Sequence, residues 1–210
     1  MSKWIDITQP LTNEIAHWPG DEPFQYETTV TKEQSGSVNI GRIISSTHTG
    51  THVDAPFHFL NDGKRILDLD IERYIGPCRV IDVSNFTAIN KTALQSVITT
   101  QTERLLIKTS LPNDPTRFPT DVPAITADGA AYMASLGVKL VGVDVPSVDP
   151  IESKELIGHH ALYKHDIYIL ENIMLDQVEI GAYELIALPL ALTEADGSPV
   201  RAVIKPIKEG

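Results

Sequence analysis

Three of the seven histidines of this chain lie, with one aspartate, in the short stretch STHTGTHVDAPFHFL, residues 46–60. The four residues are His48, His52, Asp54 and His58. Imidazole and carboxylate groups together can bind a metal ion, and a histidine beside a serine can serve as the base of a nucleophilic catalyst. Such a density of these groups around Gly50 is unusual for a loop with ordinary hydrogen bonds, so the stretch predicts a metal site or a catalytic site.

The spacing of these residues constrains the path of the chain. On a straight strand, which rises ~3.3 Å per residue, His48 and His52 would lie roughly 13 Å apart, too far for one ion. Ligand atoms lie ~2.0–2.2 Å from a metal ion, so the chain must fold back between the two histidines. Gly50 is the residue best able to take the backbone angles that this requires. Because Gly50, Val53 and Pro56 disfavour a continuous helix, we predict a kinked strand end or a tight loop.

Several chemistries fit a site of this composition. Imidazole and carboxylate without thiolate suit Zn²⁺, Mn²⁺ or Fe²⁺. An aspartate has two oxygens, so Asp54 could hold two ions at once and leave a water between them. A serine nucleophile is disfavoured because the chain has no G-x-S-x-G elbow. A mononuclear iron oxygenase built on His52, Asp54 and the distant His159 remains an alternative, as does a metal-binding module without catalysis.

Further candidate ligands lie in the second half of the chain, in GHHALYKHDIYILEN. His159 and His160 are adjacent on a predicted helix, and periodicity does not say which one faces a site. Glu171 follows the apolar run IYIL at the end of a predicted strand, where side chains commonly enter a site in α/β folds. Asp144, at the end of LVGVDV, either lines the same cavity or caps a turn before Pro146.

The elements that must position these residues change in type along the chain. The first third contains short strand-like runs at 4–8, 25–31 and 38–47, and we predict that it is all β. Strand-like and helix-like segments then alternate, at 79–84, 90–98, 104–109, 126–137, 139–145, 152–165 and 167–171. Asn90 and Thr126 are predicted N-caps, and Gly137 is a predicted C-cap. Alternation of this kind predicts βαβ units and a partly parallel sheet, so the fold class is α/β with a β-rich N-terminal third.

The overall composition of the chain indicates its domain organisation and limits the classes of molecule that it is expected to bind. The 210 residues, without a compositional break, are expected to form one domain over 1–210. A formal charge of −11 disfavours nucleic acid and anionic lipid, so we expect a small-molecule partner. No apolar run resembles a membrane span or a signal peptide. The single cysteine, Cys78, fits a reducing compartment, and a cytoplasmic location is the expectation.

The string from His48 to His58 resembles the signature H-x-G-T-H-x-D-x-P-x-H of the metal-dependent cyclase-like hydrolases. The resemblance extends through WIDITQPL, WPGD, GVDVPSVDP, ILEN and LPLALTEADGSPVRAV, and so covers nearly the whole chain. These flanking blocks are similar to the branch of bacterial kynurenine formamidases, or arylformamidases. Isatin hydrolases are a sibling group that would share the metals and differ in the substrate pocket.

The resemblance implies a swivelling β/β/α cyclase-like fold, a homodimer and two divalent metal ions per subunit, usually zinc. Carried over by position, one ion is bound by His48, His52 and Asp54, and Asp54 bridges to a second ion held by His159 and Glu171. The implied proton donor and acceptor is His58, and the implied partner of the substrate's aromatic ring is Trp18. The implied reaction is hydrolysis of an aryl formamide, N-formyl-L-kynurenine, to L-kynurenine and formate in tryptophan degradation, with metal-activated water as the nucleophile.

Overall fold

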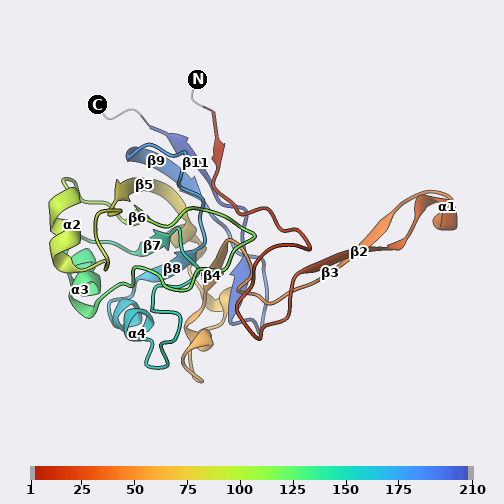
Figure 1. The fold of residues 1–210 in the computed structure, drawn as a ribbon, viewed down its shortest axis with the longest axis horizontal. Coiled ribbons are helices and arrows are strands. Elements are labelled where there is room, and N and C mark those ends of the chain that lie inside the picture. The colour runs from red at the N-terminus through yellow and green to blue at the C-terminus, as the bar shows by residue number, and fades with distance from the viewer. Residues whose placement is uncertain (1–2, 208–210) are drawn as a thin grey trace.

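A curved sheet of nine strands forms the body of the protein in the computed structural model, which describes residues 3–207 (Figure 1). In spatial order the strands are β1 (Ile5–Asp6), β11 (Val203–Pro206), β9 (Gly181–Ile186), β5 (Ile75–Asp82), β6 (Arg104–Lys108), β7 (Leu140–Val143), β8 (Tyr168–Glu171), β4 (His52–Asp54) and β10 (Gly197–Pro199). The central strands β5, β6, β7 and β8 are parallel, and the pairings on either side of them are antiparallel. The prediction of a partly parallel α/β sheet is therefore confirmed.

Three helices cover one face of the parallel strands (Figure 1): α2 (Lys91–Val97), α3 (Ala127–Ser135) and α4 (Ile157–Lys164). The predicted N-caps are confirmed, because the Asn90 side chain accepts a hydrogen bond from the Ala93 amide and the Thr126 hydroxyl accepts one from the Gly129 amide. After α3 the chain turns at Gly137, whose φ is 84°. The glycine thus supplies the left-handed residue just past the helix end, as its C-cap prediction requires.

The sheet is buried on both faces. On the helix side, Leu94, Met133 and Leu162 pack with strand residues such as Ile107 and Val141. On the opposite side a second cluster gathers alternate strand residues, including Leu106, Leu170 and Leu185, with Tyr74. Because successive strand residues point to opposite faces, a buried parallel strand is apolar at every position, as RLLIK and LVGV are. No helix within residues 3–207 is long and apolar enough to cross a membrane.

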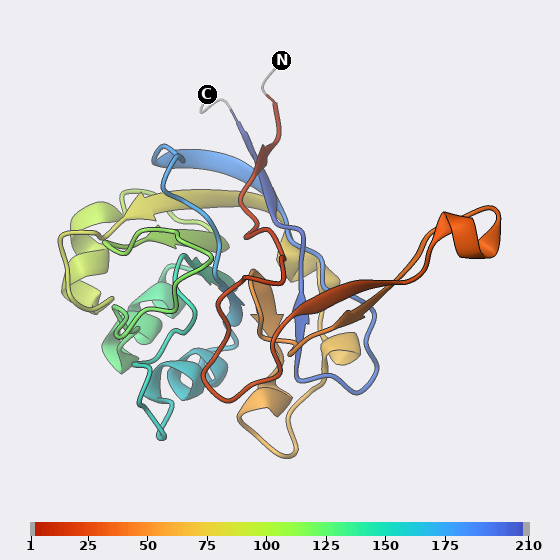
Figure 2. The ribbon, with the colours of Figure 1, turned by 45° about the vertical axis from the view of Figure 1, so that its right-hand side comes forward.

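The first third of the chain is not all β, which corrects the prediction for that region. Strands β2 (Gln25–Val30) and β3 (Ile40–Ile44) form a hairpin that projects from the body, and its tip carries the short helix α1 (Lys32–Ser35) (Figure 2). A capping box between Thr31 and Gln34 starts this helix, and Gly36 ends it at φ 76°. Three 3₁₀ turns follow β4: η1 (Pro56–His58), η2 (Ile66–Asp68) and η3 (Ile71–Tyr74).

Candidate metal centre

A tight turn and the short strand β4 place the first part of the site. Gly50 has φ 68°, so the chain folds back between His48 and His52, as the spacing argument predicted. On β4 the side chains of His52 and Asp54 share one face, while Val53 is fully buried in the core cluster behind it. His52 lies directly opposite Glu171 of β8 in the antiparallel register, so the sheet itself brings this carboxylate to the cluster.

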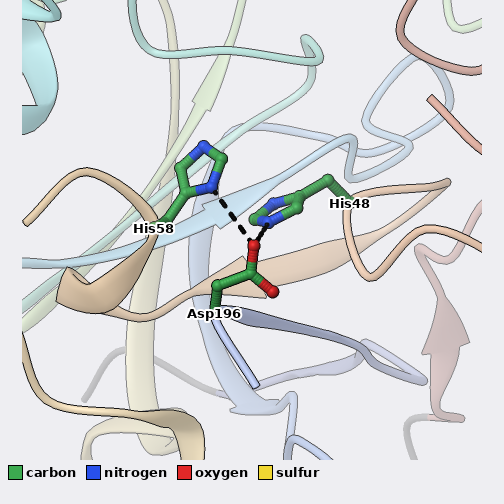
Figure 3. A group of neighbouring side chains, drawn as sticks. All are labelled: His48, His58 and Asp196. Atoms are coloured by element: carbon green, nitrogen blue, oxygen red, sulfur yellow. Dashed lines mark hydrogen bonds and ion pairs between the residues drawn. The ribbon is translucent and has the colours of Figure 1, made fainter. Parts of the chain in front are cut away.

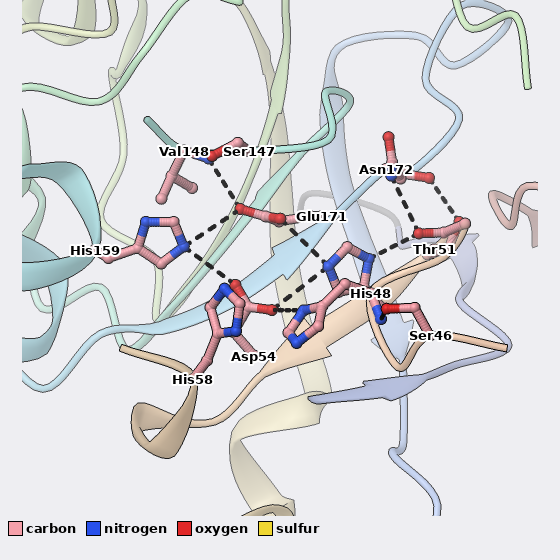
Figure 4. Close-up of polar contacts among 12 residues, drawn as sticks. Ser46, His48, Thr51, Asp54, His58, Ser147, Val148, His159, Glu171 and Asn172 are labelled. Atoms are coloured by element: carbon pink, nitrogen blue, oxygen red, sulfur yellow. Dashed lines mark hydrogen bonds and ion pairs between the residues drawn. The ribbon is translucent and has the colours of Figure 1, made fainter. Parts of the chain in front are cut away.

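His48, His52 and Asp54 form one group of converging ligand atoms. Asp54 Oδ1 lies 2.9 Å from His48 Nδ1 and 3.4 Å from His52 Nε2 (Figure 4). One such atom from each of the three residues lies within 4.8 Å of the others. These distances are those of groups that could surround one ion.

Asp54, His159 and Glu171 form a second group, and all three are buried. Asp54 uses its other oxygen here, since Oδ2 lies 3.4 Å from His159 Nε2. Glu171 Oε1 lies 4.0 Å from the same nitrogen, and Glu171 Oε2 lies 3.3 Å from His52 Nε2. Both carboxylates therefore face the two groups at once, which is the arrangement that a pair of neighbouring ions requires.

Each of the three ligand histidines, His48, His52 and His159, also has an oxygen partner at the ring nitrogen that points away from the other ligands. The partners are the Gly50 carbonyl oxygen at 2.8 Å from His52 Nδ1, Asp149 Oδ2 at 2.7 Å from His159 Nδ1, and Asp196 Oδ2 at 3.1 Å from His48 Nε2. A ring N–H that donates to an oxygen leaves the other nitrogen with its lone pair toward the cluster. This is the usual support of metal-binding histidines.

The electrostatics of the cluster favour bound positive charge. Burial alone would lower the pKa of His48, but hydrogen bonds with Asp196 and Asp54 outweigh it and raise this pKa to about 9. The pKa values of His52 and His159 are raised to about 10 in the same way, against burial, by the surrounding carboxylates. The pKa of Asp54 is held well below its usual range by hydrogen bonds with these histidines, although burial opposes the shift. A divalent cation can replace the protons that these imidazoles hold, so the residues present fit a metal site.

The neighbouring carboxylate Asp149 accounts for the choice between the two adjacent histidines on α4. Asp149 accepts hydrogen bonds from the backbone amides of Gly158 and His159, at 2.7 and 2.9 Å, and so caps the N-terminus of the helix. The same carboxylate holds the His159 ring, which is 3% exposed, whereas His160 is exposed to solvent. The structure thus places His159, and not His160, beside Asp54.

His58 lies at the open edge of the cluster and faces Asp196 (Figure 3). His58 Nδ1 is 3.6 Å from Asp196 Oδ2, the oxygen that also contacts His48. The rings of His48 and His58 lie against each other, with centroids 4.0 Å apart. Thr47 Oγ1 donates to the second oxygen of Asp196 at 2.9 Å and fixes this carboxylate.

Asp196 was not singled out from the sequence, where it appeared only within the block LPLALTEADGSPVRAV. The signal available was a carboxylate beside a glycine at a strand start. A Cβ on Gly197 would lie 2.6 Å from His48 Cε1, so only glycine lets β10 pack against that ring. No spacing rule connects residue 196 to residues 48 and 58, since only the pairing of β10 with β4 brings them together.

A cavity of about 310 Å³ opens beside the two ligand groups. It is bordered by the cluster histidines, by His58 and by Trp18, which lies in the loop before β2. Trp18 meets Phe118 edge to face, with ring centroids 5.3 Å apart. Asp144 does not line this cavity and instead lines a neighbouring one, so of the two roles considered for it, the one in this cavity is wrong. Asp144 follows the last residue of β7, and its carboxylate accepts a hydrogen bond from the Thr109 amide at 2.9 Å.

Comparison with known proteins agrees with this architecture. Residues 5–150 match the family described as "Putative cyclase". Over its whole length the chain superimposes on a potential metal-dependent hydrolase with cyclase activity, with TM-score 0.83 and 24% identity over 100% of both chains. An isatin hydrolase with a bound product analogue gives TM-score 0.82 at 20% identity, over 99% of this chain and 93% of the other. The cyclase-like fold expected from the sequence is therefore confirmed.

The chain belongs to the cyclase family of hydrolases. Within that family its sequence groups with kynurenine formamidases: it is 60% identical to those of Bacillus mycoides and Bacillus anthracis, over 98% of this chain and 99% of each relative. The resemblance read from the histidine signature is thereby confirmed. Iron oxygenases with such a ligand set usually have a double-stranded β-helix, and the mixed sheet of this chain is a different fold, which disfavours that alternative.

Proposed function

We propose that this chain is an arylformamidase that hydrolyses N-formyl-L-kynurenine to L-kynurenine and formate in tryptophan degradation. The observation that carries the proposal is the pair of ligand groups sharing Asp54, beside a cavity that also holds His58 and Trp18. The 60% identity to kynurenine formamidases over nearly the full chain supports this choice of substrate.

Two divalent metal ions, zinc or less readily manganese, are the proposed cofactors. His48, His52 and Asp54 would hold one ion, and Asp54, His159 and Glu171 would hold the other. When bound, such ions lower the pKa of a water and polarise a carbonyl group, which an amide needs in order to be hydrolysed near neutral pH.

His58 is the proposed proton donor and acceptor of the reaction. An anilide leaves only when its nitrogen is protonated, and His58 lies on the cavity side of the cluster, within reach of a bound substrate. Asp196 would orient the His58 ring and the His48 ring together, because one of its oxygens faces both. Trp18 would pack on the aromatic ring of the substrate at the other side of the cavity.

A second copy of the chain is the proposed macromolecular partner. The hairpin of β2 and β3 stands away from the body (Figure 2). It exposes apolar side chains on both strands, namely Tyr26, Ile40, Ile43 and Ile44. Exposed apolar surface of this kind is typical of contact sites, and the family resemblance implies a homodimer. Ile43→Glu should convert a dimer to a monomer in light scattering, and a wild-type chain that runs as a monomer would contradict this proposal.

Residues 1–210 would act as one hydrolase domain, and the lone Cys78 agrees with a cytoplasmic location.

The test of the proposed function is a side-by-side assay of formate release from N-formyl-L-kynurenine and ring opening of isatin, with metal analysis of the same protein. We expect activity on the formamide, its loss after treatment with a chelator, and its return with Zn²⁺. Faster turnover of isatin would assign the chain to the sibling activity instead. Unchanged activity after complete metal removal would refute metal dependence.

A further inference from the structure

A second cavity, of about 440 Å³, lies beside the histidine cavity at the carboxyl end of β7. Its wall is formed by the loop between β6 and α3, with Asn113, Arg117 and Phe118, and by Asp144 and Pro146 after β7. We call it the side cavity. Neither the metal ligands nor His58 line it, so the mechanism described above makes no use of it.

The side cavity adjoins the histidine cavity. Pro146 lines both cavities. A small hollow between them is bordered by Trp18 and His48 on one side and by Arg117 and Phe118 on the other. Since the Trp18 ring contacts the Phe118 ring, a substrate ring on Trp18 would lie at the entrance to the side cavity.

Asp144 gives the side cavity an unsatisfied acceptor. Its side chain is 5% exposed, and Oδ2 accepts a hydrogen bond from the Thr109 amide at 2.9 Å. Oδ1 is buried and has no hydrogen-bond partner among residues 3–207. A buried carboxylate oxygen without a donor is costly, so its presence beside a cavity calls for an explanation. Burial raises the pKa of this carboxyl to about 7, and a cation beside it would oppose that shift.

Arg117 supplies the opposite charge on the same wall. It is an exposed side chain, and its guanidinium can pair with a carboxylate by two parallel hydrogen bonds. The wall also carries two exposed carboxylates, Asp114 and Asp121, so that the buried carboxylate of Asp144 is one of three. A cavity that offers carboxylates together with a guanidinium is complementary to a zwitterion. The proposed substrate carries such a group, because its aromatic ring bears a side chain that ends in an ammonium and a carboxylate.

We propose that the side cavity binds the α-amino-acid group of the substrate, with Asp144 accepting from the ammonium and Arg117 pairing with the carboxylate. This inference rests on the proposed function and names Asp144 and Arg117 as the residues that would select the substrate by its charged tail. The formamide would then lie at the ligand groups, the ring on Trp18, and the charged tail beyond Phe118. The histidine cavity holds a rival pair of charges, Asp21 and Lys154. Asp21 is exposed to solvent and accepts a hydrogen bond from Ser46 Oγ at 3.0 Å, whereas Asp144 has a buried oxygen without a donor.

The test compares two substrates that differ only in the tail: N-formyl-L-kynurenine and 2-formamidoacetophenone, which keeps the ring, the ketone and the formamide. Asp144→Asn keeps an acceptor for the Thr109 amide and removes the charge, and Arg117→Gln changes an exposed side chain. For each variant we expect KM for N-formyl-L-kynurenine to rise by about 10- to 100-fold, the effect of losing a hydrogen bond to a charged group. KM for the truncated substrate should stay at the wild-type value.

Asp62→Asn is the matched control, because it removes one negative charge from an exposed residue that does not line either cavity. Equal losses on both substrates in Asp144→Asn and Arg117→Gln would overturn the proposal. A tail-specific loss in Asp21→Asn alone would also overturn it and place the tail at the other end. Failure of the wild-type protein to release formate from either substrate would instead refute the proposed function.

Discussion

Replacing Asp196 with asparagine removes the one charge that faces both a proposed metal ligand and the proposed proton donor. Asparagine has nearly the shape of aspartate, and its side-chain oxygen can still accept a hydrogen bond from one imidazole ring. It has no negative charge with which to attract both rings. The substitution removes the charge from a contact of 3.1 Å to His48 Nε2 and from one of 3.6 Å to His58 Nδ1. Loss of a carboxylate behind a metal-binding histidine typically costs about 10- to 100-fold in metal affinity or activity. We expect kcat/KM to fall within that range, less than in a variant without the His58 ring.

The assay is steady-state formate release at saturating metal, with metal content measured on the same sample. A series of formanilides separates the two effects, because better leaving groups need less proton donation and should show a smaller deficit. Glu194→Gln is the matched control, since that carboxylate lies in the same loop and is 81% exposed. Wild-type kcat in Asp196→Asn at full metal content, or a deficit that is independent of the leaving group, would refute the positioning role.

The other predictions concern the ligands, the ring contact, the packing of the site and one buried acid. His58→Ala should lower turnover by about 10²- to 10⁴-fold and keep its metal, whereas His52→Ala should lose metal as well; equal metal loss in both would contradict the division of roles. Trp18→Ala should mainly raise KM, and an unchanged KM would remove it from the pocket. Gly197→Ala should weaken metal binding in a chelator competition, because its Cβ would displace the His48 ring; wild-type affinity would show that the ring can yield. The raised pKa of Asp144 means that the folded state keeps a proton which the unfolded state has lost between about pH 4 and pH 7, so this group makes stability fall as pH rises through that window. Denaturant titrations from pH 5 to pH 8 measure this decrease in the free energy of unfolding, which is on the order of a few kcal/mol at about 1.4 kcal/mol per pKa unit. The decrease should be absent in Asp144→Asn. Parallel pH dependences of the wild type and the variant would contradict the raised pKa.

The amino-acid sequence by itself determined the local features of this protein. The return of the chain at Gly50, the shared face of His52 and Asp54, and the caps at Asn90 and Thr126 all depend on residues within a few positions of one another. Steric limits on the backbone and the two-residue period of a strand are sufficient to predict them. The apolar parallel strands and their alternation with helices along the chain could likewise be predicted, because a strand buried on both faces is apolar throughout.

Only the tertiary structure decided which distant groups meet. Helical periodicity left His159 and His160 equivalent, and only the family resemblance selected His159; the structure supplies the physical reason, because Asp149 caps α4 and binds the His159 ring. Asp196 reaches His48 and His58 only because β10 pairs with β4, across 148 positions of sequence in the case of His48. Asp144, just after β7, lines a second cavity, and its carboxylate accepts from the amide of Thr109, which follows β6. Such contacts are set by strand pairing and helix packing, and no pattern of neighbouring residues contains them.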